Sequence, residues 1–217
     1  MASILLYIYY FFRSVYYRGP VKTIKFLLYE PRYEKLFGIK TLQIKKSADK
    51  DNYHYQGAGY LVLLDVLKKL PNNLKNKPFI DFGSGKGRAL FCAEYSGFNK
   101  LIGVELDLDL VNEAKQNEIS YSKKRNESTF NFIHQNVLDY KIPDDVAVFF
   151  FFNPFSDAIM KQVANAILQS HQKNKRDIFI VYVNPKHKNV WEEAGFTLFL
   201  KEVNFRYTEA LIYKLSV

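Results

Sequence analysis

Short apolar runs recur along most of the chain, separated by polar or turn-forming segments. Seven such runs lie near residues 78–82, 100–104, 130–134, 146–152, 178–183, 196–203 and 209–215. Runs of this length, bounded by turn signals, are typical of buried β-strands. The run at 146–152 is apolar throughout, which is the pattern of a strand covered on both faces. The spacing therefore predicts a sheet of seven strands.

Helical patterns separate the earlier strands. Apolar residues recur at helical spacing over 60–70 and stop before Pro71. Similar patterns begin near Leu110 and after Ser156, which stands at an N-cap position. Alternating strands and helices predict a mostly parallel sheet with right-handed crossovers. Only residues 204–208 join the last two runs. This is too short for a parallel crossover, so these runs predict an antiparallel hairpin.

Length and cysteine usage set outer limits on this α/β protein. A chain of 217 residues suits one domain and a modest extension. The single cysteine, Cys92, excludes a disulfide framework and indicates a reducing compartment, so we expect a cytoplasmic protein. Cys92 lies in an apolar helical pattern and is expected to be buried. No Cys/His cluster has the spacing of metal ligands, so no metal is expected.

A glycine-rich segment follows the first predicted strand. Residues 81–88 read Asp-Phe-Gly-Ser-Gly-Lys-Gly-Arg, and a helix-like pattern begins at Ala89. Glycine lets a ligand approach bare backbone because it carries no side chain. The helix that follows offers unpaired N–H groups at its start. The segment therefore predicts a site for a nucleotide-like ligand, with an ordinary strand-to-helix turn as the alternative.

The glycine spacing distinguishes between classes of nucleotide. The dinucleotide fingerprint is G-x-G-x-x-G, and Arg88 stands where its third glycine would be. A Walker A loop requires G-x-x-x-x-G-K-[ST], but Ile80 occupies its first glycine position and Gly87 follows Lys86. Neither phosphate-binding template fits.

An acid ends the second predicted strand. Glu105 lies 22 positions after Gly83, and an acid about 20 residues on is placed to accept hydrogen bonds from ribose hydroxyls. A solvated charge at a strand end is the alternative. Together the loop, the acid and the order of seven strands resemble the class I S-adenosylmethionine (SAM) methyltransferases, whose motif I is an acidic residue followed by G-x-G-x-G. The resemblance covers roughly residues 57–217 and is to bacterial enzymes of undefined substrate.

The resemblance implies a single Rossmann-like, three-layer domain that binds SAM and releases S-adenosylhomocysteine. The residues implied to contact this cofactor are Asp81, Gly83, Ser84, Gly85, Gly87, Glu105 and Asn136. Asp81 matches the acid near the methionine amino group. Asn136, after the third strand, matches the adenine contact, with Asp139 as the competing candidate and a simple turn role as the alternative. Tyr55 and Gln56 are implied to close over the cofactor.

The fourth predicted strand is followed by Asn153-Pro154-Phe155. This resembles the [DN]-P-P-[YFW] motif of amino-methylating enzymes, with one proline missing. The Asn153 carbonyl can accept N–H bonds from an amine, and the Phe155 ring can stack on a planar substrate or border an ammonium group. The alternative is a strand-ending turn, because Asn184-Pro185 follows the fifth strand in the same way.

The resemblance therefore implies methyl transfer to an amine nitrogen of a protein lysine or another amine. Adenine in a nucleic acid is the second acceptor. A non-catalytic binding module of the same fold and a dinucleotide-dependent oxidoreductase are the rival functions.

Residues 1–56 differ from the rest of the chain in charge. They hold ten Lys/Arg against four Asp/Glu, so six of the nine net positive charges lie there, and seven aromatic residues fall between Tyr7 and Tyr17. The apolar start is interrupted at Arg13, too early to span a bilayer, and it lacks the features of a signal peptide. Three interpretations stay open. They are a helical cap that forms part of the substrate site, a peripheral membrane contact through residues 1–30, and a nucleic-acid surface.

Overall fold

The computed structural model describes residues 2–42, 57–122, 128–204 and 207–217. The strands in these ranges are β1 Phe79–Phe82, β2 Lys100–Glu105, β3 Thr129–His134, β4 Val148–Phe151, β5 Ile178–Val183, β6 Thr197–Asn204 and β7 Tyr207–Leu215. Each strand coincides with one of the seven apolar runs, so the predicted strands are confirmed.

Seven helices lie in the described ranges, four of them (α3 to α6) where the apolar spacing predicted them, whereas the helix at Asn189–Glu193 was not predicted. They are α1 Ala2–Arg18, α2 Pro20–Phe37, α3 Tyr60–Leu67, α4 Arg88–Tyr95, α5 Leu108–Ser122, α6 Asp157–Lys173 and α7 Asn189–Glu193, with short 3-10 turns η1 Asn72–Leu74 and η2 Val137–Asp139. Ser156 does occupy the N-cap position of α6, although its side chain makes no capping bond within the described residues.

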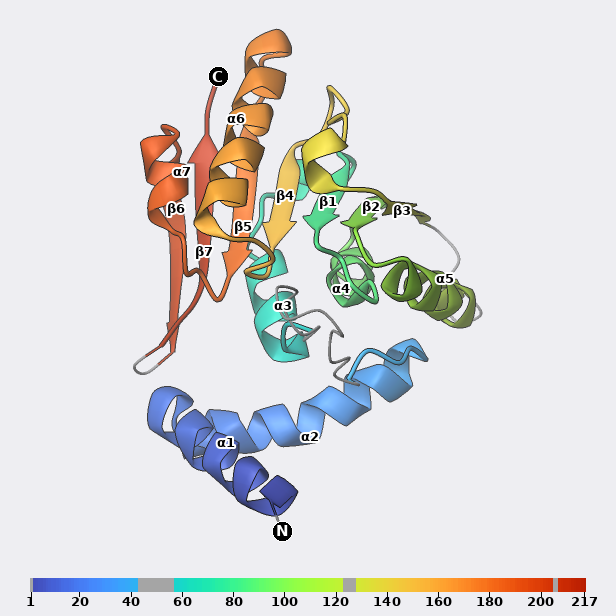
Figure 1. Cartoon of the computed structure of the whole chain (residues 1–217), viewed down its shortest axis with the longest axis vertical. Helices are drawn as coiled ribbons and strands as arrows, with labels where there is room; N and C mark the ends of the chain where they lie inside the picture. Colours follow the sequence, from blue (N-terminus) through green and yellow to red (C-terminus); the bar gives the residue numbers. More distant parts are fainter. Residues whose placement is uncertain (1, 43–56, 123–127, 205–206) are drawn as a thin grey trace.

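The strands form one sheet in the order β3-β2-β1-β4-β5-β7-β6 (Figure 1). The first five strands pair in parallel, whereas β7 is antiparallel to both β5 and β6, which confirms the predicted hairpin. The direction of strand addition reverses between β1 and β4. Ligands of open α/β sheets bind at the carboxyl ends of the strands beside such a reversal. The loop at 81–88, which follows β1, lies at this point.

Helices cover both faces of the sheet, and the side chains of β4 alternate between the two cores. Val148 and Phe150 pack in the cluster shared with α3, α4 and α5. Phe149 and Phe151 pack in the cluster shared with α6 and α7. All four are buried, as expected of a strand covered on both faces.

Helices α1 and α2 lie beyond the carboxyl ends of the parallel strands (Figure 1). They are joined at Gly19, whose φ of 78° is a backbone conformation that glycine adopts readily. Helix α2 ends at Gly38, a left-handed C-cap whose N–H donates to the Glu34 carbonyl. Across the described part of the chain, no helix combines the length and apolarity needed to cross a bilayer.

Candidate functional site

The backbone of the loop at 81–88 is shaped by its glycines. Gly83, Gly85 and Gly87 have φ values of 78°, 53° and 82°, a region that favours residues without a Cβ. The N–H groups of Gly83 and Ser84 donate to the Val104 carbonyl at 2.9 and 3.3 Å. These bonds hold the loop against the end of β2.

Glu105 contacts the loop directly. Its Oε2 accepts a hydrogen bond from the Gly85 N–H at 2.8 Å. Its Oε1 accepts from the N–H groups of Leu106 and Asp107 at 2.8 and 3.0 Å. A carboxylate that accepts backbone N–H bonds is held in one orientation. Glu105 is therefore a fixed acceptor beside the glycine loop rather than a solvated strand-end charge.

Asp81 is the buried acid of the site, with 3% of its surface exposed. Burial raises the pKa of its carboxyl well above the ordinary value, and the negative charge of Glu105 raises it further. The folded protein thus favours a neutral Asp81 unless a positive charge is brought close to it.

Ser84 and Gly87 shape the loop from within. The Ser84 Oγ is buried and has no hydrogen-bond partner among the described residues. It lies against β2, because a Cβ built on Gly103 would be 2.7 Å from it. A Cβ on Gly87 would be 2.8 Å from the Phe132 ring. Glycine at 87 therefore permits close packing between the loop and β3.

The Asn153-Pro154-Phe155 segment lies directly against the glycine loop. A Cβ on Gly83 would be 2.6 Å from the Pro154 Cβ, so only glycine allows this approach. Asn153 has a φ of 49°, which is uncommon for a residue with a side chain. Its Oδ1 accepts a hydrogen bond from the Tyr182 hydroxyl at 3.4 Å. Phe155 is half-buried and packs on the core beneath α6.

The second Asn-Pro pair, Asn184-Pro185, shows whether the backbone conformation at Asn153 is particular to that site. Asn184, after β5, has a φ of 52°, nearly that of Asn153. Both pairs therefore end a strand with the same left-handed turn, so the backbone conformation does not distinguish them. The contact with the glycine loop at Gly83 distinguishes Asn153-Pro154.

Asn136 is exposed and caps η2. Its Oδ1 accepts a hydrogen bond from the Leu138 N–H at 3.0 Å, the local bond expected of a turn asparagine. Asp139, the competing residue, is also exposed. Tyr55 and Gln56 lie outside the described residues.

Arg88 has a role that motif reasoning missed. Its side chain is buried and points away from the loop toward the N-terminal helices. The guanidinium donates to Glu30 Oε2 and to the Ala58 carbonyl at 2.9 Å each, and to Thr41 Oγ1 at 2.6 Å. It also lies 4.5 Å from the centre of the Tyr60 ring.

The two glutamates around Arg88 are themselves bonded to the start of α3. Glu30 Oε1 accepts from the Tyr60 N–H at 2.8 Å, and Glu34 Oε1 accepts from the Tyr60 hydroxyl at 2.6 Å. Burial raises the pKa of Glu30, while the Arg88 charge opposes that rise. Helix α2, α3 and the helix of the glycine loop therefore share one buried polar network. The spacing of these residues in the sequence carries no signal that would reveal it.

The other cation of the loop, Lys86, is also directed away from the ligand side. Its side chain is 3% exposed, and its Nζ lies 2.7 Å from Glu113 Oε2 on α5. The Lys86 carbonyl accepts from the Asn117 side chain at 3.1 Å. Asn117 Oδ1 in turn accepts from the Lys40 N–H at 2.8 Å. Helix α5 thus fixes the loop and the segment after α2 together.

Neither a family model nor a curated protein matches the sequence, whereas solved structures match the fold. Magnesium protoporphyrin IX methyltransferase from Synechocystis, crystallised with bound SAM, is 15% identical over 71% of this chain and 77% of its own, with a TM-score of 0.51. A SAM-dependent methyltransferase from Leishmania major is 14% identical over 72% of this chain and 71% of its own, with a TM-score of 0.53.

A third structure, a candidate RNA methyltransferase from Pyrococcus horikoshii, is 17% identical over 84% of this chain and 98% of its own, with a TM-score of 0.52. Likeness at these identities is a likeness of fold. Together with the strand order and the antiparallel hairpin, it shows that this chain has the Rossmann-like fold of these methyltransferases.

Proposed function

We propose that this chain is a SAM-dependent methyltransferase whose acceptor is an amine nitrogen. The observation that carries the proposal is the contact between the glycine loop and Glu105, where the Gly85 N–H donates to the carboxylate at 2.8 Å. This contact lies at the carboxyl end of the sheet, beside the reversal of strand order. Proteins of the same fold that were crystallised with SAM or S-adenosylhomocysteine support it.

The charges around the loop fit SAM better than a nucleotide with phosphates. A phosphate site needs cations or N–H groups turned toward the ligand. Here the cations of Lys86 and Arg88 are both buried in bonds with glutamates of α5 and α2. SAM carries no phosphate and has an amino group and a ribose. The buried Asp81 carboxyl fits the former, and the acceptor-only Glu105 fits the latter.

The acceptor site is proposed at Asn153, Pro154 and Phe155. The contact of Pro154 with Gly83 puts this segment beside the cofactor loop. The Asn153 side-chain carbonyl can accept an N–H bond and so orient the lone pair of an amine. The Phe155 ring offers an apolar wall for a lysine stem or a planar amine.

The chain's task in this reaction is mainly alignment and exclusion of water. SAM, when bound, would supply a methyl group on a positively charged sulfur, and the sulfur would keep the C–S bonding pair as a neutral thioether. The acceptor nitrogen must be neutral to form the new N–C bond, so it gives its proton to water. Asn153 holds the remaining N–H, and the apolar side chains around Phe155 disfavour the charged ammonium.

Calorimetry tests the cofactor half of the proposal. Glu105→Gln should weaken SAM affinity about tenfold to a hundredfold, because it removes a hydrogen bond to a charged group. Glu193→Gln, at an exposed acid on α7, is the matched control and should bind normally. Failure of the unmodified chain to bind SAM or S-adenosylhomocysteine would refute the proposal.

Labelled SAM tests the acceptor half. Incubation with cell extract should label material that protease removes and nuclease leaves. Asn153→Ala should lose most of this labelling while it keeps its SAM affinity, because Asn153 is proposed to orient only the acceptor. Nuclease-sensitive label would instead identify a nucleic-acid acceptor, and full labelling by Asn153→Ala would remove Asn153 from the mechanism.

A further inference from the structure

Helix α2 has two different faces. One packs on the rest of the protein through Thr23, Phe37 and the glutamates bonded to Arg88. The remainder of the helix surface carries aliphatic side chains that nothing in the described structure covers. These are Val21, Ile24, Leu27 and Leu28, which are between 51% and 67% exposed. Exposed aliphatic residues at helical spacing are characteristic of a surface that meets an apolar partner.

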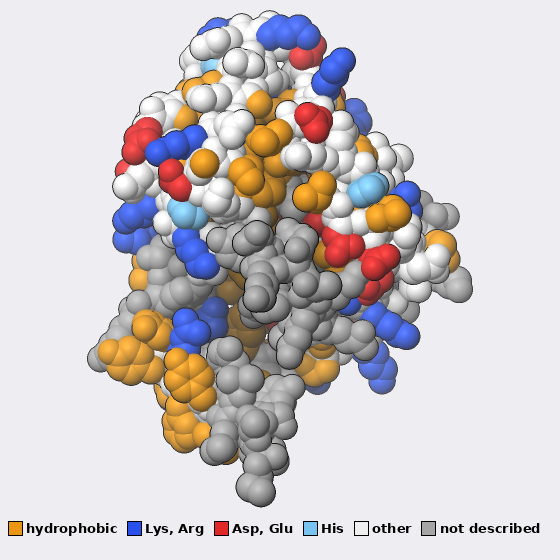
Figure 2. All heavy atoms as spheres, in the orientation of Figure 1, with side chains coloured by type: hydrophobic (Ala, Val, Ile, Leu, Met, Phe, Trp, Pro, Cys, Tyr) orange, Lys and Arg blue, Asp and Glu red, His pale blue; other side chains and the backbone are white. Residues whose placement is uncertain are grey.

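Helix α1 extends the apolar surface with aromatic residues. Tyr9, Phe12 and Tyr16 are between 57% and 64% exposed. Figure 2 shows hydrophobic side chains gathered at the surface where α1 and α2 meet, with Lys and Arg side chains beside them. Amphipathic aromatic side chains of this kind favour the boundary between water and lipid.

The charged side chains of the two helices that are exposed all carry the same sign. Residues 2–37 contain six cations, which are Arg13, Arg18, Lys22, Lys25, Arg32 and Lys35. Their two acids, Glu30 and Glu34, both face inward and interact with Arg88. Among residues 2–37 the exposed charged side chains are Arg13, Lys25, Arg32 and Lys35, all of them cations.

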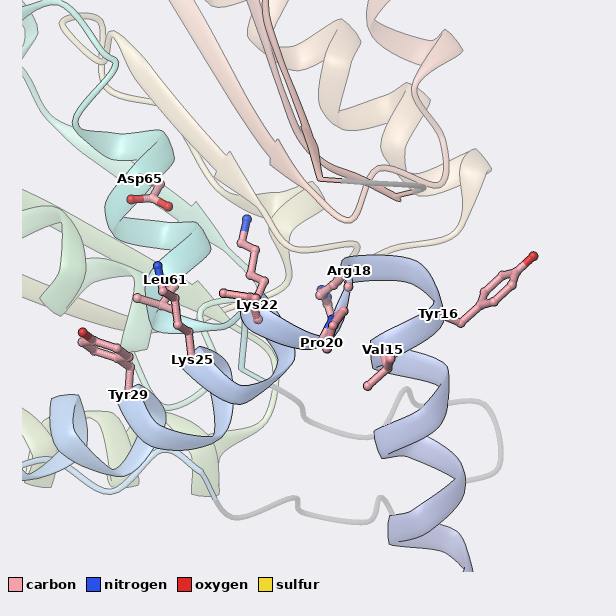
Figure 3. A pocket seen from close by; sticks show the side chains of 11 residues that line it. Val15, Tyr16, Arg18, Pro20, Lys22, Lys25, Tyr29, Leu61 and Asp65 are labelled. Atoms are coloured by element: carbon pink, nitrogen blue, oxygen red, sulfur yellow. The ribbon is translucent and has the colours of Figure 1, made fainter.

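A cavity of about 710 Å³ borders this surface where α1 turns into α2 (Figure 3). Arg18, Lys22 and Lys25 line it from the two N-terminal helices, and Leu61 and Asp65 line it from α3. Three cations opposite one carboxylate give the cavity a net positive lining. Figure 3 shows Lys22 and Lys25 pointing from α2 toward α3 across this cavity.

We propose that the outward face of α1 and α2 binds the surface of an anionic phospholipid bilayer. The aliphatic residues of α2 and the aromatic residues of α1 enter the interface, and the exposed cations Arg13, Lys25 and Arg32 contact lipid phosphates. Charge complementarity selects an anionic membrane. A nucleic acid fits less well, because it would pair with the cations and aromatic rings but leave Val21, Ile24, Leu27 and Leu28 in water. This inference does not depend on methyl transfer.

Vesicle co-sedimentation with the full chain tests the proposal. The protein should pellet with vesicles of phosphatidylcholine mixed with phosphatidylglycerol, should stay in the supernatant with phosphatidylcholine alone, and should be released by rising NaCl. Lys25→Gln with Arg32→Gln should weaken binding about thirtyfold, as expected for two cations near an anionic surface. Ile24→Asn with Leu28→Asn should also weaken binding, since it removes apolar contact.

Matched controls lie at the other end of the molecule. Lys141→Gln with Lys175→Gln removes the same charge from exposed positions before β4 and β5, and Leu198→Asn removes an exposed aliphatic residue on β6. Both control proteins should bind vesicles normally, and circular dichroism should show that every variant is folded. Equal recovery from the supernatant with both kinds of vesicle would overturn the proposal. A second result would also overturn it: the unmodified chain fails to bind vesicles but binds a single-stranded oligonucleotide, and the Ile24/Leu28 variant binds that oligonucleotide equally well.

Discussion

At the scale of single residues, the candidate site contains a carboxyl group kept out of water. Asp81 is buried beneath the glycine loop, and the pKa of its carboxyl is raised by that burial and by the nearby charge of Glu105. Such a group responds to the charge of a ligand more strongly than an exposed acid does, since water does not screen it. Burial favours the neutral form of Asp81, and a positive charge placed beside it would favour the ionised form.

The raised pKa of Asp81 predicts a pH dependence of stability. The folded chain holds this proton at pH values where the unfolded chain has lost it. The contribution of Asp81 to the free energy of unfolding therefore falls as pH rises from about 3.8 through the raised folded pKa. Asp81→Asn should remove this fall, so its stability relative to the unmodified protein should grow with pH and then level off. Urea unfolding at a series of pH values measures it, and a constant difference would contradict it.

The same residue predicts a proton linked to SAM binding. A ligand ammonium beside Asp81 favours its ionised form, so binding should release about one proton at a pH below the raised pKa. Calorimetry in buffers of different ionisation enthalpy should give different binding heats for the unmodified chain. Asp81→Asn should give the same heat in each buffer. Heats that are already identical in the unmodified chain would show that Asp81 does not change its charge.

At the scale of elements, two loops from neighbouring strands are packed so closely that one of them requires glycine. Pro154 after β4 lies against Gly83 after β1, at a distance that excludes a side chain. The contact joins the proposed cofactor end and the proposed acceptor end of the site. It is long-range in the sequence and depends on β1 and β4 being neighbours in the sheet.

Two alanine substitutions distinguish the stability cost of this close contact from the cost of a positive φ alone. Gly195→Ala should cost about 1–2 kcal/mol, because Gly195 has a φ of 84° and open space around it. Gly83→Ala has a similar φ of 78° and in addition a Cβ 2.6 Å from Pro154, so it should cost clearly more and should weaken SAM binding as well. Denaturant unfolding of both variants measures the difference. Equal losses would show that the loops adjust to one another freely.

At the scale of the whole molecule, the N-terminal helices and the sheet domain share one buried cation. Arg88 begins α4 but is bonded to Glu30 on α2, so the link crosses the expected boundary between residues 56 and 57. Asn117 makes a second link, between the loop at Lys86 and the segment at Lys40. The helices that carry the proposed membrane surface are thereby joined to the helix that begins at the glycine loop.

Arg88→Met should therefore destabilise the whole chain. Removal of one partner from a buried ion pair leaves unpaired charge, which costs about 3–5 kcal/mol. Arg32→Met, at an exposed position on the same helix as Glu30, is the control and should change stability by less than about 1 kcal/mol. Denaturant unfolding measures both, and equal effects would show that the network contributes little to stability.

The sequence by itself determined the strands, most of the helices and the place of the glycine loop. These follow from local causes: apolar runs form strands, glycines allow positive φ, and a short connector forces a hairpin. It also singled out Glu105 and Asn153, because strand ends and their turns are visible in the sequence. In the structure Glu105 contacts Gly85 and Pro154 lies against Gly83, while the roles of these residues toward SAM and the acceptor stay predictions.

Only the tertiary structure decided where the charged side chains point. In the sequence, Arg88 stands where the dinucleotide fingerprint has its third glycine, and Lys86 is a cation within a glycine-rich loop. Both are turned inward to glutamates that lie on other helices. Likewise, the apolar pattern of α2 does not indicate which side of the helix is buried. Glu30 and Glu34 lie on the buried side, because both interact with Arg88. Such ion pairs form because folding brings together elements that are far apart in the chain. The local sequence pattern does not indicate which of these elements become neighbours.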